Sequence, residues 1–169
     1  MRSMVLTLIA DDRPGLVEAL AAAVARCGGN WIESRMARLA GQFAGLVRVE
    51  LPEASRAALE QALESVTGRG VRLQTADGGV TSSEPARLVA LELTGADHPG
   101  ILAGVTRVLA LHHVNIEELE TECVSAPMSG DRLFRARARL GLPAGLDEAT
   151  LHADLERIAS DLMVDLELR

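Results

Sequence analysis

The four residues Asp12-Arg13-Pro14-Gly15 occur again 85 residues later as Asp97-His98-Pro99-Gly100, and this repeat is the main indication of the fold. The residues around it return at the same spacing: Leu6, Leu8, Leu16, Val17, Leu20, Val24 and Asn30 correspond to Leu91, Leu93, Ile101, Leu102, Val105, Leu109 and Asn115. A repeat of this length is a duplicated supersecondary unit. The chain of 169 residues is therefore expected to form two copies of one small domain.

Each copy is expected to follow the order β-α-β-β-α-β. Apolar periodicity and the glycine and proline breaks between segments give the boundaries. In the first copy the predicted elements are a strand 4–10, a helix 14–27, hairpin strands 30–39 and 43–51, a helix 54–67 and a strand 70–76. In the second they are a strand 87–95, a helix 99–112, hairpin strands 114–124 and 132–141, a helix 147–161 and a strand 163–168. This is the ferredoxin-like α+β arrangement, an antiparallel sheet with helices on one face.

The domain boundaries follow from this order: domain 1 spans 1–77, a Gly/Ser/Pro-rich linker spans 78–86, and domain 2 spans 87–169. A unit of this size buries only ~60–65% of the surface of its unfolded chain, so we expect each half to pack against another module. The second hairpin is longer by six residues around Ala126–Gly130. This extension is either a partner or lid loop or a tolerated surface insertion.

The second hairpin also predicts a charged face of the sheet. Glu118, Glu120 and Glu122 alternate with other residues on one strand, and Arg135, Arg137 and Arg139 alternate with apolar residues on the next. Antiparallel pairing sets these rows against each other, at ~0.2–1 kcal/mol per opposite-charge pair. We interpret the rows as a solvated, self-neutralised face rather than an anion site or an acid/base pair.

Charge and composition limit the function. The net charge is −7, lysine is absent, and the arginines are interspersed with carboxylates, which argues against direct contact with nucleic acid. No signal-peptide pattern and no apolar run of ~20 residues occurs, so we expect a cytoplasmic protein that does not enter a membrane. Cys27 and Cys123 lack a CxxC spacing and are expected to be buried free thiols in a reducing compartment.

The duplicated turn is the candidate binding feature. Aspartate can cap a helix, proline suits its first turn, and the adjacent glycine leaves the first amides open to an anion such as a carboxylate. Arg13 and His98 occupy the variable position, and both are basic. Asn30 and Asn115 open the next strand and carry both donor and acceptor groups. The alternatives stay open: the turns are helix caps only, and the asparagines only mark helix-to-strand turns.

No enzyme constellation emerges. The four histidines have no metal-ligand spacing, no serine lies in a nucleophile elbow, and no phosphate loop occurs. We therefore expect no catalytic residues, no metal and no cofactor. A small enzyme that uses His98 or the carboxylates is a remaining rival hypothesis, which loss of turnover in His98→Ala would support.

The Asp-x-Pro-Gly turn after strand 1, the amphipathic helix, the asparagine that opens strand 2 and the β-α-β-β-α-β order resemble the ACT domain family, twice over nearly the whole chain. The resemblance implies a regulatory module that binds small molecules, most often amino acids, between paired domains. The ligand contacts of the family fall here on Asp12, Arg13, Pro14, Gly15, Asn30, Asp97, His98, Pro99, Gly100 and Asn115.

Two ACT domains without a catalytic partner resemble, more narrowly, the glycine cleavage system transcriptional repressor family. This implies a non-catalytic, homo-oligomeric regulator that binds glycine or a similar amino acid and modulates a DNA-binding regulator. A ligand-independent interaction or dimerisation module is the alternative. The sequence does not identify the ligand, the partner or the oligomeric state, nor whether one turn or both bind.

Overall fold

The structure is a computed structural model that describes residues 1–67, 70–79, 87–126 and 130–169. The chain divides into two compact units, Met1–Thr81 and Ser82–Arg169. Most of the predicted linker 78–86 and the centre of the predicted extension Ala126–Gly130 lie outside the described residues.

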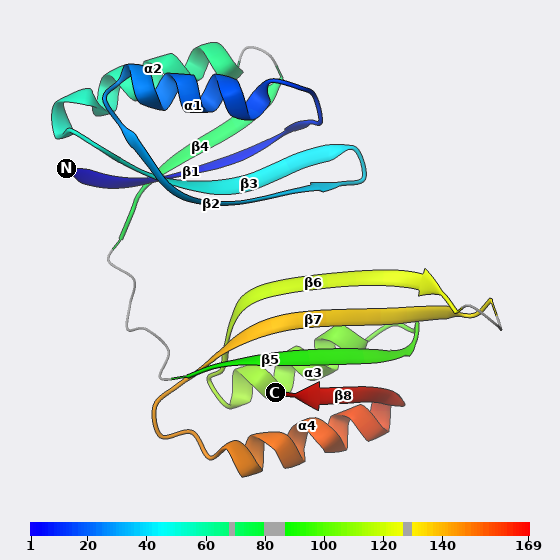
Figure 1. Cartoon of the computed structure of the whole chain (residues 1–169). Coiled ribbons are helices and arrows are strands. Elements are labelled where there is room, and N and C mark those ends of the chain that lie inside the picture. The colour runs from blue at the N-terminus through cyan, green and yellow to red at the C-terminus, as the bar shows by residue number, and fades with distance from the viewer. Residues whose placement is uncertain (68–69, 80–86, 127–129) are drawn as a thin grey trace. The chain divides into compact units, whose positions relative to one another are not determined.

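The first unit is a four-stranded antiparallel sheet in the order β2-β3-β1-β4. Its elements are β1 (Arg2–Asp11), α1 (Leu16–Arg26), β2 (Asn30–Leu39), β3 (Gln42–Leu51), the short 3-10 helix η1 (Glu53–Ser55), α2 (Arg56–Thr67) and β4 (Val71–Asp77). Both α-helices cover one face of the sheet (Figure 1). The predicted element order is confirmed, and β2 is an edge strand.

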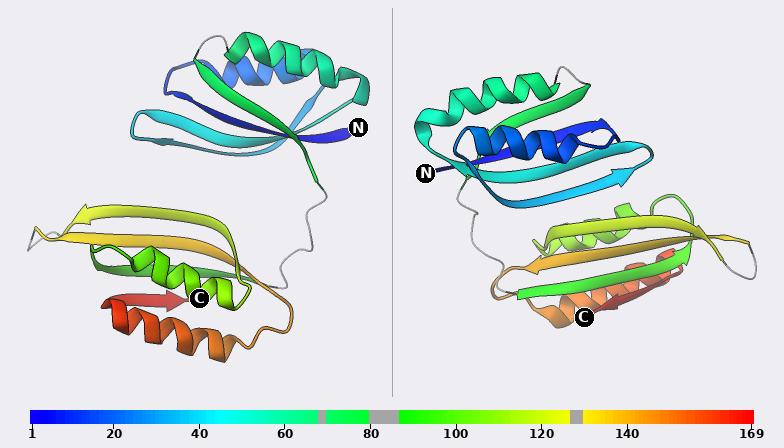
Figure 2. Two further views of the ribbon diagram at one scale, coloured as in Figure 1. Left: turned by 180° about the vertical axis from the view of Figure 1, so that it is seen from behind. Right: turned by 45° about the horizontal axis from the view of Figure 1, so that its top comes forward.

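The second unit repeats this topology with the strand order β6-β7-β5-β8. Its elements are β5 (Arg87–Ala96), α3 (Ile101–Leu111), β6 (Asn115–Ser125), β7 (Arg132–Leu142), α4 (Glu148–Leu162) and β8 (Val164–Leu168). Figure 2 shows α3 and α4 on one face of this sheet. The predicted α+β fold, two ferredoxin-like βαββαβ modules, is therefore confirmed for both halves.

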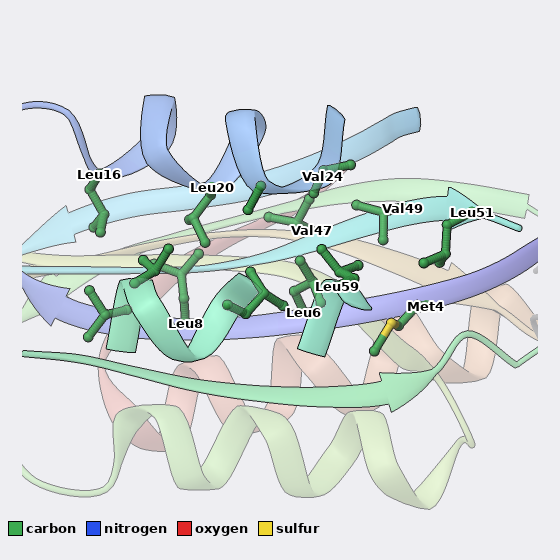
Figure 3. Packing of buried hydrophobic residues seen from close by; sticks show 14 of the residues in the cluster. Met4, Leu6, Leu8, Leu16, Leu20, Val24, Val47, Val49, Leu51 and Leu59 are labelled. Carbon is green, nitrogen blue, oxygen red and sulfur yellow. The ribbon is translucent and has the colours of Figure 1, made fainter. Parts of the chain in front are cut away.

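Aliphatic side chains fill the space between each sheet and its helices. In the first unit, alternate residues of β1 and β3 point toward α1 and α2 (Figure 3). Leu6, Leu20 and Leu59 are completely buried there, and Leu151 and Leu155 of α4 hold the same place in the second unit. Burying one such side chain contributes about 1.5–3 kcal/mol. The core is thus built by apolar residues that recur every two residues in the strands and about every 3.6 residues in the helices.

The charged face predicted for the second hairpin is confirmed by the strand register. Glu118, Glu120 and Glu122 of β6 lie opposite Arg139, Arg137 and Arg135 of β7. The side chains of Arg139 and Glu118 are 3.1 Å apart. These rows are on the face of the sheet that the helices leave open, because the alternating apolar residues of β7 are buried on the other face.

Two expectations about burial are wrong. The apolar positions 16, 17, 20, 24 and 27 of the sequence predict one inward stripe on α1, but Val17 is 44% exposed, and its counterpart Leu102 is 37% exposed. The exposure of Val17 follows from the orientation of α1, because the side of this helix that faces the core is formed by Leu16, Leu20, Ala23 and Val24. Both cysteines are free, but Cys123 is exposed and Cys27 is only half-buried. Cys123 lies on the edge strand β6, where residues 119–123 are all exposed.

Candidate functional site

Hydrogen bonds and an ion pair connect the turn after β1 to the end of the β2–β3 hairpin. The Asp12 amide donates to the Gly41 carbonyl at 3.0 Å. The Asp12 carboxylate pairs with the Arg38 guanidinium, with Oδ2 and Nε 2.7 Å apart. One residue earlier, the side chain of Gln42 donates to Asp11 Oδ1 at 2.6 Å. The hairpin therefore holds the turn in place before the helix begins.

The helix after this turn begins at Leu16, and its N-cap residue is Gly15. Gly15 has φ 87°, a left-handed conformation that glycine adopts without the steric cost of a side chain. No side chain caps the helix, and a Cβ on Gly15 would have no atom within 4 Å. The expectation that Asp12 caps α1 and that Pro14 lies in its first turn is therefore wrong. The left-handed glycine directs the chain into the helix two residues after the proline.

The turn after β5 has the same construction. The Asp97 amide donates to the Arg132 carbonyl at 2.9 Å, and the Asp97 carboxylate lies 3.5 Å from Arg132 Nε. Gly100 is the N-cap of α3 with φ 99°, again without a side-chain cap. Asp97 therefore does not cap α3, contrary to expectation, and Pro99 precedes the helix. The duplicated sequence has produced a duplicated helix start with open space beside its glycine.

The variable residue of the turn behaves differently in the two copies. Arg13 is exposed. His98 is partly buried, and its Nε2 lies 2.8 Å from the Leu162 carbonyl oxygen at the end of α4. Its Nδ1 lies 3.1 Å from the Pro99 carbonyl oxygen. The hydrogen bonds to these two carbonyls raise the pKa of His98 above its ordinary value of 6.5, more than partial burial lowers it.

The predicted asparagines are not beside the turns of their own units. Asn30 is opposite Glu50 of β3, which in turn is opposite Ser3 of β1, whereas the turn follows Asp11. Eight residues of strand separate these levels, about 26 Å at ~3.3 Å per residue. Figure 1 shows the start of β2 and the start of α1 at opposite ends of the first unit. Asn115 is placed in the same way, and its side chain donates to Glu117 Oε1 at 2.7 Å.

Each turn thus contains four of the five ligand-binding residues predicted for its unit, and a helix begins at its end. The backbone amides at the start of each helix carry a partial positive charge, and no side chain caps them with a hydrogen bond. Such a place favours a carboxylate or another small anion. The carboxylates of Asp12 and Asp97 already face arginines, so an incoming ammonium group would compete with Arg38 or Arg132.

Sequence reasoning missed an open hollow on the outer face of the first sheet. Its volume is about 840 Å³, and its lining includes Thr7, Ile9, Leu46 and Arg72. A smaller hollow of about 340 Å³ on the second sheet is lined mainly by Glu92, Thr94, Arg135 and Arg137. Alternation along the strands places these side chains on the outer faces of the sheets. Strand residues line both hollows, and the turns do not contribute to them.

In the part of the chain that the structure describes, no group of three or more His, Cys, Asp or Glu side chains is arranged to hold a metal ion. Within the same residues, no helix has the length and apolar character needed to cross a membrane.

The chain is similar over nearly its whole length to proteins and structures already known. It is 24% identical over 164 residues to the glycine cleavage system transcriptional repressor of Escherichia coli K12, covering 94% of this chain and 85% of that protein. A solved structure of an unknown protein from Galdieria sulphuraria is 34% identical with a TM-score of 0.89, and the match covers 99% of this chain and 97% of that one.

A third similarity concerns the fold alone. The solved structure of a candidate glycine cleavage system transcriptional repressor is 18% identical to this chain, with a TM-score of 0.74 over 99% of this chain and 96% of that one. It has the same fold at a sequence identity too low to carry function.

Family sequence models match both halves. An ACT domain model matches residues 2–69, and a second ACT domain model matches residues 89–136. The two matches together span more than half of the chain and lie in separate units. With the likeness to a transcriptional repressor, the ACT domains support a regulatory role. The chain belongs to the ACT domain family, with one ACT domain in each of its two units.

Proposed function

We propose that the chain is a non-catalytic regulatory protein that binds a small amino acid, glycine or a similar one, where ACT modules meet, and thereby modulates a partner transcription regulator. The observation that carries this proposal is the duplicated helix start at Gly15 and Gly100, each left without a side-chain cap. The likeness over 94% of the chain to a glycine cleavage system transcriptional repressor supports the ligand class.

The ligand's carboxylate would accept hydrogen bonds from the first amides of α1 or α3, where the helix dipole favours negative charge. Its ammonium group would meet Asp12 or Asp97. Each of these carboxylates now pairs with an arginine, so binding would exchange one cationic partner for another. This exchange gives the ligand a way to change the contact between turn and hairpin.

An interface between modules would bring the asparagines into the same site. Within one module, Asn30 and the turn at Asp12 are ~26 Å apart, so one small ligand cannot contact both. If the edge strand β2 paired antiparallel with the β2 of a second copy of the chain, the two strands would run in opposite directions. The start of one β2 would then lie near the end of the other, beside the partner's turn. We therefore propose a homo-oligomer whose ligand lies at such an interface.

Charge supports a protein partner rather than nucleic acid. Residues 1–81 contain nine arginines and nine acidic residues, whereas residues 82–169 contain eight arginines and fifteen acidic residues. The whole net charge of −7 therefore belongs to the second unit. DNA-binding regulators carry basic surfaces, so this unit is the better complement for such a partner.

The proposal is tested by thermal unfolding of the purified chain against each of the twenty amino acids at millimolar concentration. A ligand at 100 times its Kd adds ~2.7 kcal/mol of stability, which raises Tm by several degrees. For a ligand of about five heavy atoms, ~1.5 kcal/mol per atom limits affinity to the low micromolar range. We expect a selective rise with glycine or another small amino acid that Asn30→Ala or Asn115→Ala diminishes.

The same titration discriminates the alternative. If Tm stays flat with every amino acid while the chain still binds a purified DNA-binding regulator, the protein is a ligand-independent interaction module. In that case the uncapped helix starts are structural only.

A further inference from the structure

His98 joins two parts of the second unit that are 64 residues apart in the sequence. Its Nε2 lies 2.8 Å from the carbonyl oxygen of Leu162, and its Nδ1 lies 3.1 Å from the carbonyl oxygen of Pro99. A carbonyl oxygen only accepts hydrogen bonds, and a neutral imidazole has a single N–H. Both contacts are hydrogen bonds only when the ring is protonated on both nitrogens.

The surroundings of the ring favour this cation. Leu162 is the last residue of α4, where the final carbonyls have no partner within the helix and carry partial negative charge. Among charged side chains, Asp97 of the turn acts on the ring and favours the cation, and Arg132 of β7 in turn pairs with Asp97. From α4, the contact with the ring is made by the Leu162 carbonyl.

We propose that protonation of His98 fastens the second turn to the end of α4, so that binding of a carboxylate at Gly100 is coupled to proton uptake, whereas the first turn is insensitive to pH. The first turn has Arg13 in the same position, and arginine keeps its charge at every physiological pH. The coupling to ligand rests on the proposed function, whereas the fastening does not.

The fastening is tested by nuclear magnetic resonance of the full chain labelled with 13C and 15N, between pH 5 and 9. We expect the His98 ring to titrate above 6.5, and the Leu162 carbonyl to shift with the same midpoint. The Leu162 carbonyl must lose this transition in His98→Gln. The control is His113→Asn, which removes an exposed histidine at φ 54°, a conformation that asparagine tolerates. It should leave the Leu162 transition unchanged.

A Leu162 carbonyl that does not follow the His98 midpoint would overturn the fastening, as would a His98 ring that titrates below 6.5. The coupling has its own readout, the affinity of the second turn for glycine at pH 6 and pH 8.5, measured in an Asp12→Ala background that removes the carboxylate proposed to meet the ligand's ammonium group at the first turn. We expect about fivefold or more weaker binding at the higher pH, in the usual range of such couplings. Equal affinities would overturn the coupling, and absence of any binding would instead count against the proposed function.

Discussion

Asp12 and Arg38 lie 2.7 Å apart, from Oδ2 to Nε, and connect the turn after β1 to the far end of β2. The Arg38 side chain is 68% exposed, so water screens most of the attraction between the two charges. Exposed pairs of this kind contribute about 0–1 kcal/mol to folding. The pair therefore contributes little to stability and mainly fixes the position of a carboxylate beside the helix start.

Arg38→Ala should separate these two roles. We expect a loss of at most about 1 kcal/mol of unfolding free energy, because the pair is exposed. We also expect a change in amino-acid affinity, because the Asp12 carboxylate is released from its competing cation. Urea unfolding and calorimetric titration measure the two effects, and Arg26→Ala on α1 serves as a control for loss of an arginine. A loss of several kcal/mol would show that the pair is structural.

Gly15→Ala and Gly100→Ala should each destabilise the protein through backbone strain alone. Both glycines have left-handed φ, which costs an L-residue about 1–2 kcal/mol, and an added Cβ would meet no atom within 4 Å. Chemical denaturation measures the loss. Gly79→Ala is the matched control, because that glycine also has open space but no left-handed φ. Equal effects at Gly79 and Gly15 would contradict the explanation.

Leu59→Ala and Leu151→Ala should each destabilise its own unit by about 2–5 kcal/mol, because both side chains are completely buried on the second helix of their units. Amide hydrogen exchange resolves the two units. We expect protection to fall mainly in the unit that carries the substitution, because each unit has its own apolar core. A uniform loss over both units would mean that they unfold as one cooperative body.

Asp147 should make the stability of the second unit depend on acid pH. Its carboxylate caps α4, accepting from the Thr150 hydroxyl at 2.6 Å and from the Ala149 amide at 3.1 Å. These hydrogen bonds, the Thr150 hydroxyl first, hold the pKa of Asp147 below its ordinary value of 3.8. The stabilisation is therefore present above pH 3.8 and is lost as the pH falls through the lowered pKa.

Asp147→Ala should accordingly lower the melting temperature at pH 7, and the difference from the unsubstituted protein should shrink as the pH falls below 3.8. Asp147→Asn is the control, since it keeps an acceptor for the cap without a titrating charge. A difference that stays constant from pH 7 to pH 2.5 would show that the carboxylate charge has no part in the cap.

The repeat and its apolar periodicities predicted the order of helices and strands, because this order depends on residues that are close together in the sequence. Alternation at period two fixes which face of a strand is apolar, and hairpin closure then sets Glu118 against Arg139. The start of α1 could not be assigned in this way. Asp-x-Pro-Gly is compatible with a capping aspartate or with a left-handed glycine, and the contact between Asp12 and Arg38 decides for the glycine.

The buried side of α1 was only partly predictable, because alanines and other apolar residues occur nearly all round this helix. Its amphipathic pattern therefore does not exclude Val17 from the core, and the packing of α1 against the sheet and α2 determines the outcome.

The duplicated β-α-β-β-α-β domain and its two equivalent turns follow from the order of amino acids, because repeats and apolar periods act over short distances along the chain. The position of Asn30, at the other end of its sheet from the turn, and the contact of His98 with the end of α4 arise only in the folded protein. Both are contacts or separations between residues remote in sequence, and these depend on how strands are ordered and helices packed rather than on local propensity.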